Sequence, residues 1–402
     1  MVNKLLACSL SANLVLVIFE FVPACAFNII GLKAKSQQVM PQESSLKKSH
    51  TKDTDAPPIA KSLKDLGDGS KAPSANAKTL TRHMLLGDSY FEHKDYTNSL
   101  IEYQAVARDD PENFKAHYML AKVLMALSDY EEMLKETSIV VGLRPTSGDA
   151  HFIMGEALRM LNKHAEACRE YKQVLKVDRK NALAHAYLAE CYRNKRWYRP
   201  AIRDCKDAIR LEPKLVIPHL ILAQCYLSVR LQDLALGQYK EAIALNPDDP
   251  FVHVRFGKTL GALGEWNRAL EEFTSAVRLD PSYADAHRGL SWAFSNTDKL
   301  DLALKEARMA LSLSPNAPDT HSNLAWVYQK LGDHQSEVNH YRLALKLDPK
   351  NPQLHRCLGL ALSDNGDLNG AIAELLTTTR MLPNDNEAKL CLQSLMQKRN
   401  HN

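Results

Sequence analysis

Apolar and small residues recur at every thirty-fourth position along most of this chain. In the unit that begins at residue 250, positions four, seven, eight and eleven hold His253, Phe256, Gly257 and Leu260. This spacing predicts the apolar stripe of a first helix. Positions 20, 24 and 27 hold Ala269, Phe273 and Ala276, and they predict the matching stripe of a second helix. We therefore expect one pair of packed helices in each unit.

The same unit shows how the two predicted helices are joined and closed. Small residues at positions 8 and 20 allow a close approach, while Phe256 and Phe273 fill the space between the helices. Gly264 is expected in the turn between them. Pro281 is expected to end the second helix, since proline cannot continue one.

Histidine and proline mark the period most clearly. Position four holds a histidine nine times in succession: His83, His117, His151, His185, His219, His253, His287, His321 and His355. Prolines follow the same step, with Arg179 in the one gap: Pro111, Pro145, Pro213, Pro247, Pro281, Pro315, Pro349 and Pro383. A fixed period of this length is typical of a solenoid, in which each unit buries its faces against its neighbours.

Taken together, these residues closely resemble the tetratricopeptide repeat. Further units carry the same marks: Leu86-Gly87 with Tyr90 and Tyr103, Leu188-Ala189 with Tyr192, Ala201 and Ala208, and Leu324-Ala325 with Tyr328, Tyr341 and Ala344. The resemblance covers about residues 80–384 as nine repeats and leaves 385–402 as a capping helix and tail. It implies an all-α fold, a right-handed α-solenoid or superhelix of helix-turn-helix repeats. The chain departs from the family at position four, where the family favours Trp, and in the second repeat, which has Met133 and Thr137 at positions 20 and 24.

Residues 1–26 read as an export signal. Lys4 precedes an apolar centre from Leu14 to Phe19, and Ala24-Cys25-Ala26 provides small residues for cleavage. An uncleaved membrane anchor is one alternative, and acylation of Cys25 is another. We expect an exported protein, periplasmic or secreted, whose only membrane contact would come through this segment.

Residues 27–79 predict a disordered linker, because they are rich in Lys, Ser, Pro and Gln and almost without aromatic residues. Residues 1–79 contain ten Lys and six acidic residues, which accounts for the whole net charge of +4. The repeats are therefore neutral and have no electrostatic footprint for nucleic acid.

The cysteines suggest disulfides and the histidines suggest a metal site, but the spacing of these residues argues against both. Six cysteines follow Ala26, and we expect free thiols at Cys168, Cys191, Cys205, Cys225, Cys357 and Cys391. Like positions in adjacent repeats lie roughly 8–10 Å apart, too far for a disulfide or for a shared metal ion. The histidine ladder is therefore interpreted as structural, with no metal. Half-buried rings are expected to resist protonation, which would make the protein labile in acid.

The resemblance implies that the concave groove is lined by positions 2, 5, 9, 12 and 13 of each first helix. Repeats four to six place an apolar strip at positions two and five: Leu183, Ile217, Leu220, Phe251 and Val254. If exposed, such a strip marks an interaction site. The alternative is that curvature or the linker covers it.

A second zone of the groove is aromatic and polar. Trp292 and Trp326 occupy position nine of repeats seven and eight, and Arg288, Gln329 and Lys330 surround them. Aromatic anchors among hydrogen-bond donors suit an extended peptide or a sugar face. The alternative is that the indoles pack between adjacent first helices.

The sequence lacks the clamp with which this family grips acidic C-termini. That clamp needs Lys at position five and Asn at position nine, whereas the first repeat has Met84 and Asp88.

Signs of catalysis are also absent from the sequence. No GxSxG, HExxH, phosphate loop or dinucleotide fingerprint occurs. We expect a non-catalytic scaffold without a cofactor that binds a protein or peptide in its groove. A carbohydrate-binding solenoid is the alternative.

Overall fold

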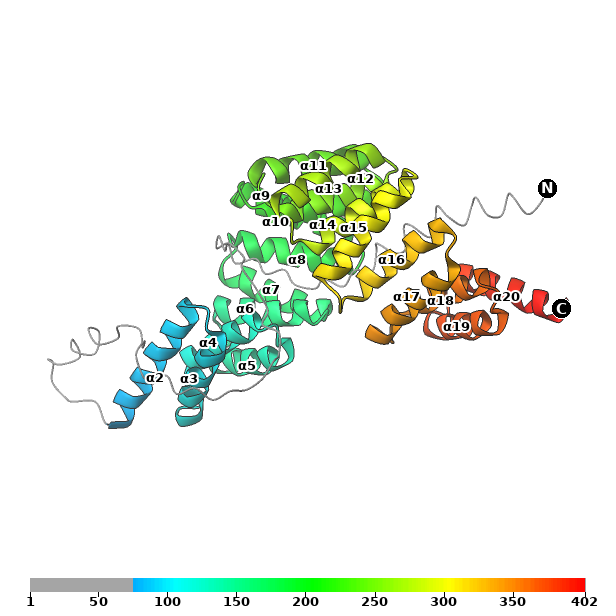
Figure 1. The fold of residues 1–402 in the computed structure, drawn as a ribbon. Helices are drawn as coiled ribbons and strands as arrows, with labels where there is room; N and C mark the ends of the chain where they lie inside the picture. Colours follow the sequence, from blue (N-terminus) through cyan, green and yellow to red (C-terminus); the bar gives the residue numbers. More distant parts are fainter. Residues whose placement is uncertain (1–74, 402) are drawn as a thin grey trace. The chain divides into compact units, whose positions relative to one another are not determined.

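The computed structural model describes residues 75–401, and all regular secondary structure in this range is helical. These residues form two compact units, one of residues 75–180 and one of residues 181–401, called here the N-terminal and C-terminal units (Figure 1). None of the described helices is long and apolar enough to cross a membrane. The predicted signal and most of the predicted linker lie outside the described residues.

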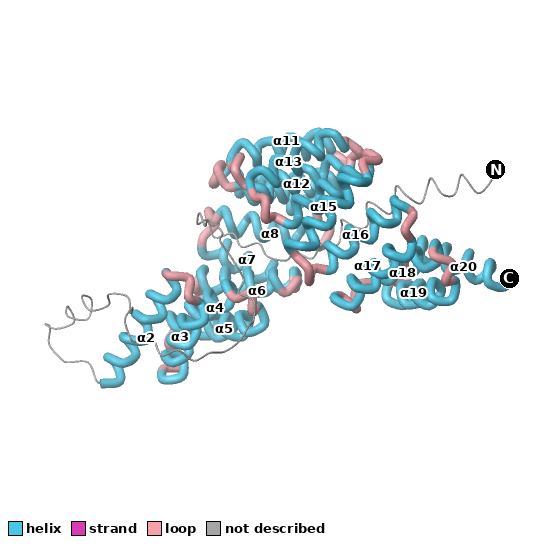
Figure 2. Tube along the Cα trace, in the orientation of Figure 1, coloured by secondary structure: helices cyan, strands magenta, loops and turns pink. Residues whose placement is uncertain are grey.

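The helices follow one another in pairs, as the period predicted. Those of the N-terminal unit are α2 (Ala75–Glu92), α3 (Tyr96–Asp109), α4 (Phe114–Ala126), α5 (Tyr130–Leu143), α6 (Gly148–Met160) and α7 (His164–Val177). Those of the C-terminal unit are α8 (Ala182–Asn194), α9 (Tyr198–Leu211), α10 (Val216–Ser228), α11 (Gln232–Leu245), α12 (Pro250–Ala262), α13 (Trp266–Leu279), α14 (Ala284–Asn296), α15 (Leu300–Leu313), α16 (Pro318–Leu331), α17 (His334–Leu347), α18 (Pro352–Asp364), α19 (Leu368–Met381) and α20 (Asn386–His401). Only short loops separate them (Figure 2).

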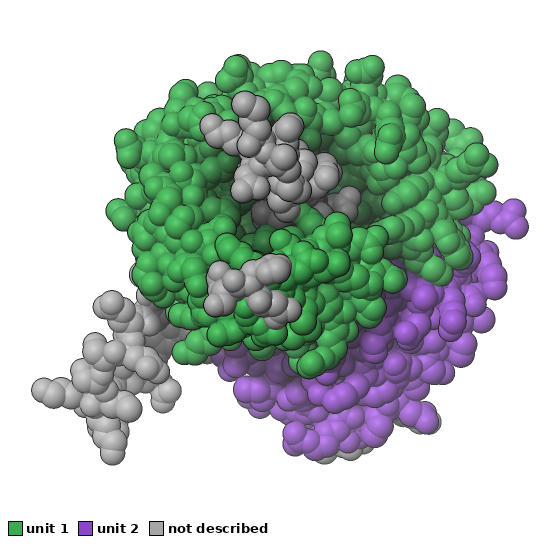
Figure 3. Space-filling model, turned by 90° about the vertical axis from the view of Figure 1, so that its right-hand side faces the viewer, with its two compact units in different colours: residues 1–23, 181–402 green, residues 24–180 purple. Residues whose placement is uncertain are grey.

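Successive pairs stack within each unit. Each first helix packs against its own second helix, and that second helix packs against the next first helix. First helices also contact one another directly, as α8 does α10 and α14 does α16. In the C-terminal unit the helices surround a hollow (green in Figure 3). Groove-lining side chains of this unit therefore come from consecutive first helices.

The turn inside every pair uses the left-handed backbone region at the same position. The residues with positive φ are Lys94, Ser128, Asn162, Arg196, Arg230, Gly264, Asp298, Gly332 and Gly366, which follow the period of the histidines. The prediction of a turn at Gly264 (φ 81°) is confirmed. Six of these nine turns place a non-glycine residue in a region that disfavours a Cβ atom, so the surrounding helices impose the conformation.

The close approach of the paired helices is also confirmed. A Cβ atom added at Gly257 would lie 2.8 Å from a ring carbon of Phe273, a ring that is fully buried. Phe256 stacks instead on Tyr239 of the preceding repeat, with 5.4 Å between ring centroids. At the C-terminal end, α20 covers the last pair by burying Ala388 and Leu395 against it, so the last repeat has a capping helix.

Candidate functional site

The histidine ladder is a series of hydrogen-bonded rungs inside single repeats. In each rung the Nδ1 atom faces the side chain 19 residues later, at position 23 of the same repeat. Its partners are Glu102, Glu136, Glu170, Asp204, Gln238, Glu272, Glu306, His340 and Glu374, at 2.6–3.3 Å. No sequence argument had singled out these partners, although they recur with the same period as the histidines.

In six rungs the other ring nitrogen, Nε2, faces the carbonyl oxygen of the proline six residues earlier, which lies just before the repeat. In the rung of His253, Nε2 lies 3.1 Å from the carbonyl oxygen of Pro247, and Nδ1 lies 2.7 Å from Oε2 of Glu272. Because both partners only accept hydrogen bonds, the doubly protonated ring satisfies them best. The hydrogen bond that His253 donates to Glu272 raises the pKa of His253 and outweighs burial, which lowers it. The expectation that ladder rings resist protonation is wrong for this rung, because the carboxylate offsets desolvation.

One rung differs in kind. His321 meets His340, with 3.3 Å between the two Nδ1 atoms. Burial lowers the pKa of His340, and the neighbouring His321 lowers it further. His340 therefore shows the lowered pKa that was expected for the position-four rings.

The predicted apolar strip is mostly buried. Ile217, Leu220 and Val254 keep 6% of their surface or less, while Leu183 and Phe251 are half-buried. The expectation of an open strip is wrong for the three buried residues. First helices contact each other directly, as α8 does α10 and α12 does α14, and this contact encloses positions two and five.

The expectation of open tryptophans is also wrong. Trp292 is 3% exposed, and its ring lies edge-on to Trp266 with 4.8 Å between centroids. A methyl group at Gly261 would overlap the indole, so Trp292 fills the space beside this glycine of the preceding first helix. Trp326 is 7% exposed, and the Lys330 Nζ atom lies 5.0 Å from its ring centroid. Trp292 therefore packs between neighbouring helices, and Trp326 is buried as well.

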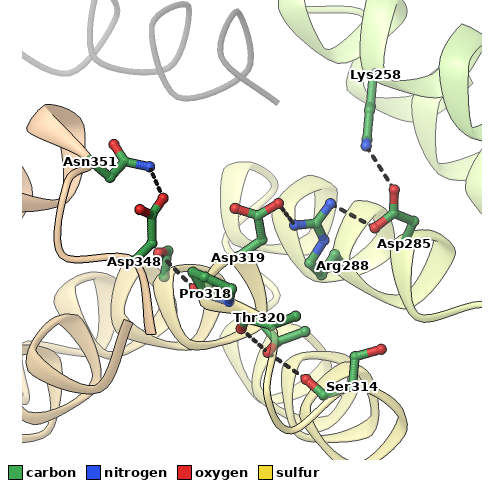
Figure 4. A network of polar contacts seen from close by, with 11 residues as sticks. Lys258, Asp285, Arg288, Ser314, Pro318, Asp319, Thr320, Asp348 and Asn351 are labelled. Carbon is green, nitrogen blue, oxygen red and sulfur yellow. Dashed lines mark hydrogen bonds and ion pairs between the residues drawn. The ribbon is translucent and has the colours of Figure 1, made fainter. Parts of the chain in front are cut away.

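A chain of ion pairs crosses three first helices of the C-terminal unit (Figure 4). Lys258 Nζ lies 3.3 Å from Asp285 Oδ2, and Arg288 Nη2 lies 2.7 Å from Asp285 Oδ1. Arg288 Nη1 then reaches Asp319 Oδ2 at 2.8 Å. Of these four ion-paired residues, only Arg288 was predicted to line the groove.

Burial gives these charges unusual titration behaviour. Burial lowers the pKa of Lys258 to about 8, because the neighbouring Asp285 offsets only part of the desolvation and Arg288 adds to the shift. Burial raises the pKa of Asp285, but Lys258 and Arg288 outweigh it and hold that pKa below its usual value. The four charges therefore depend on one another, because removing one of them leaves its neighbour buried without its partner.

The same registers recur elsewhere in the molecule. The ion pair between Arg288 and Asp319 joins position five of one repeat to position two of the next. The ion pair between Arg356 and Glu387, at 2.8 Å, joins the same two positions. Lys115 to Asp88, at 2.9 Å, uses the same positions nine and two as Lys258 to Asp285, with the charges exchanged. Groove positions of neighbouring repeats thus contact each other at offsets of 27 and 31 residues.

Repeats eight and nine keep unused hydrogen-bonding capacity at groove positions. The buried atoms Trp326 Nε1, Gln353 Oε1, Arg356 Nε and Arg356 Nη2 have no hydrogen-bond partner among the residues that the structure describes. Gln353 and Arg356 lie on the same helix, α18. Trp326 and Gln353 occupy position nine of one repeat and position two of the next, as Lys258 and Asp285 do. Among the described residues, three hydrogen-bond donors and one acceptor at groove positions of repeats eight and nine are therefore without partners. Gln329 is half-buried, and Lys330 is exposed.

All six cysteines in the described range are free, as predicted, and five of them are buried. Burial raises the pKa of Cys225 and of Cys357 to about 11 in each case, so these thiols stay protonated near neutral pH. They pack as small apolar residues.

Comparison with known proteins identifies the repeats. Family models described as tetratricopeptide repeat match residues 84–134, 149–180, 254–318 and 318–351. No curated protein matches the sequence.

Solved structures show the same fold at low sequence identity. A tetratricopeptide repeat protein from Parabacteroides merdae has a TM-score of 0.55 at 13% identity, over 62% of this chain and 99% of that one. The APC/C hetero-tetramer Cut9–Hcn1 has a TM-score of 0.53 at 15% identity, over 80% of this chain and 64% of that one. These likenesses concern the fold alone.

Proposed function

Because the chain is a tetratricopeptide-repeat protein, built as an interaction scaffold, we propose that it binds an extended segment of a protein partner. The segment lies in the concave groove of the C-terminal unit, along the first helices of repeats four to nine. The protein acts after export, in the periplasm or outside the cell, or on a membrane through its N-terminus.

The unused polar atoms of repeats eight and nine carry this proposal. An extended peptide presents backbone N–H and C=O groups in alternation, so it needs acceptors and donors along one line. Gln353 Oε1 supplies an acceptor, while Trp326 Nε1 and Arg356 Nε and Nη2 supply donors. A buried polar atom without a partner costs about 1–3 kcal/mol. The atoms are enclosed in the structure, so a peptide meets them only after the side chains of Gln353 and Arg356 rotate toward the groove, and it then recovers part of that cost.

Half-buried groups extend the surface toward the earlier repeats. Leu183 and Phe251 offer apolar contact, and the Arg255 guanidinium lies 5.1 Å from the Phe251 ring centroid. A segment with apolar residues at one end and polar or acidic residues at the other fits this order. A sugar ring needs an open aromatic face, and the burial of Trp292 and Trp326 removes the basis of the carbohydrate alternative.

A matched pair of charge reversals tests the groove. Random peptides displayed on phage are selected on the full chain, and affinities of the selected peptides are measured by fluorescence anisotropy. Lys330→Glu changes an exposed groove residue, whereas Lys305→Glu makes the same change at an exposed residue of α15. We expect Lys330→Glu to weaken binding by about tenfold, roughly 1.4 kcal/mol, and Lys305→Glu to leave it unchanged. Equal affinities for both variants would exclude the groove.

The site of action has its own test. The features of residues 1–26 support export, since Ala24-Cys25-Ala26 offers small residues to a signal peptidase. The intact mass of the protein isolated from its native source should lack this segment. A soluble protein that retains it would contradict both export by cleavage and anchoring.

A further inference from the structure

Three side chains of the C-terminal unit bring potential metal ligands together beside the predicted groove, since Asp364 is at position 13 of its repeat. His334 and Glu337 lie on the first turn of α17, and Asp364 is the last residue of α18. One ligand atom from each lies within 4.8 Å of the other two. The His334 Nδ1 atom is 3.2 Å from Glu337 Oε2. The cluster therefore joins the eighth repeat to the ninth.

Glu337 is out of place in the repeat pattern. It occupies position 20, where the paired helices approach most closely. The other repeats hold small or apolar residues there: Ser99, Met133, Ala167, Ala201, Ala235, Ala269, Ala303 and Ala371. Glu337 is 0% exposed, and its Oε1 atom has no hydrogen-bond partner within the described range. Packing alone gives no reason for a carboxylate at this contact.

Glu337 lacks a full charge partner. The ion pair that it makes among the described residues is with His334, and its second carboxylate oxygen has no hydrogen-bond partner there. Asp364 is exposed, so the buried carboxyl of the cluster is that of Glu337. A buried carboxylate without charge compensation is strongly unfavourable.

We propose that His334 Nδ1, a Glu337 carboxylate oxygen and an Asp364 carboxylate oxygen bind one divalent transition-metal ion of the zinc type. One imidazole and two carboxylates are donors that zinc accepts. In a tetrahedral zinc site with bonds of about 2.0–2.1 Å, neighbouring ligand atoms are about 3.3 Å apart, which agrees with the His334–Glu337 separation. His334 is 38% exposed, so water has access to complete the coordination.

A second cluster of the same kind is weaker. His185, Asp204 and Asp207 also lie within reach of one another. Asp204 already belongs to the histidine ladder, and Asp207 pairs with Arg210 at 2.7 Å. Asp204 Oδ2 also lacks a hydrogen-bond partner in the part of the chain that the structure describes, but it lies 3.5 Å from Arg203 Nη2. Both acids therefore have an arginine beside them, whereas the ion-pair partner of Glu337 in that part is His334.

Glu337→Ala offers a test in which folding is not at risk, because alanine is the residue that six other repeats hold at this position. The full chain is stripped with a chelator and titrated with zinc chloride by calorimetry, and its melting is followed with and without zinc. His164→Gln is the matched control, since His164 begins α7 as His334 begins α17, but Ala167 replaces the glutamate.

We expect the wild-type chain to bind one zinc ion at this site and to melt at a higher temperature with zinc. Glu337→Ala and Asp364→Asn should weaken that binding at least about 100-fold, more than the loss of an outer-shell group. Without metal, Glu337→Ala should melt at a higher temperature than the wild type, so the order of the two reverses when zinc is added. His164→Gln should bind as the wild type does.

Two results would overturn the proposal. One is equal zinc affinity in the wild type and in Glu337→Ala. The other is a zinc-induced shift in melting temperature that Glu337→Ala retains, since binding to the folded state alone must raise stability only where the site is intact. Cobalt substitution gives an independent readout, because the absorption bands of bound cobalt should disappear in Glu337→Ala and persist in His164→Gln.

Discussion

His253 donates from Nδ1 to Glu272 across a distance of 2.7 Å, inside a single repeat. Four other rungs combine a carboxylate on Nδ1 with a proline carbonyl on Nε2, so the arrangement belongs to the repeat and not to one residue. The histidine at position four is therefore a hydrogen-bonded clasp between the turn that precedes a repeat and its second helix.

Glu272→Gln tests the charge of this clasp. The folded-state pKa of His253 is raised, so its contribution is fully present below the unfolded value of about 6.5 and is lost as pH rises through the folded pKa. At pH 6 the variant should lose about 1 kcal/mol, the difference between a charged and a neutral hydrogen bond. At pH 8.5 the loss should be smaller.

Denaturant midpoints of both proteins at the two pH values provide the measurement. Gln238 already serves as the partner of His219 at 2.9 Å, so glutamine fits this position. An equal loss at both pH values would show that the ring is neutral in the folded protein.

His340→Glu should remove the acid-sensitive rung. The pKa of His340 is lowered, so its contribution is present above about pH 6.5 and is lost as pH falls through the folded pKa. Glutamate would give His321 the partner that most rungs have. We expect a gain of about 1–2 kcal/mol at pH 5.5 and little change at pH 8, measured by chemical denaturation. A variant that remains as acid-labile as the wild type would place the sensitivity elsewhere.

Trp292→Ala should be severely destabilising. The indole is 3% exposed and fills the space above Gly261, so truncation leaves a cavity that costs about 3–5 kcal/mol. Trp197 is 50% exposed, and Trp197→Ala should cost about 1 kcal/mol or less. Urea unfolding compares the two variants. Similar costs would mean that Trp292 lies on an open surface.

Two glycines with open space around them separate backbone strain from packing. A Cβ atom would meet nothing within 4 Å at either Gly264 or Gly237. Gly264 has φ of 81°, so Gly264→Ala should cost about 1–2 kcal/mol. Gly237 lies inside α11, and Gly237→Ala should stabilise by about 0.5–1 kcal/mol. Thermal unfolding of the pair should show shifts of opposite sign.

The fold was predictable because its determinants lie within one repeat. The stripe through Phe256 and Leu260, the small residue Gly257 and the turn at Gly264 all act on neighbours of the same helix pair. The fixed period then repeats that local solution along the chain. Residues 385–402, which continue the first-helix pattern, were predicted as a cap for the same reason.

The groove was predicted poorly because its surface is set between repeats. Trp292 is buried by Gly261 of the preceding repeat, and Arg288 finds Asp319 in the following one. Assigning groove positions one helix at a time leaves out such contacts, so the exposure of Ile217, Leu220 and Val254 was overestimated. The carboxylates of the ladder carried a visible signal, since a carboxylate follows each histidine after 19 residues with only two exceptions, Gln238 and His340.

The clasp also bears on how the chain comes to be folded while it is being made. Pro247, His253 and Glu272 lie within one continuous stretch, so a ribosome that has released Glu272 has released every group that this rung requires. No later part of the chain is needed to complete this rung. Contacts this local form fast, and nascent domains fold in order from the N-terminus. Each new repeat would therefore be fastened as it emerges, and its remaining apolar face would be covered as soon as the next repeat follows.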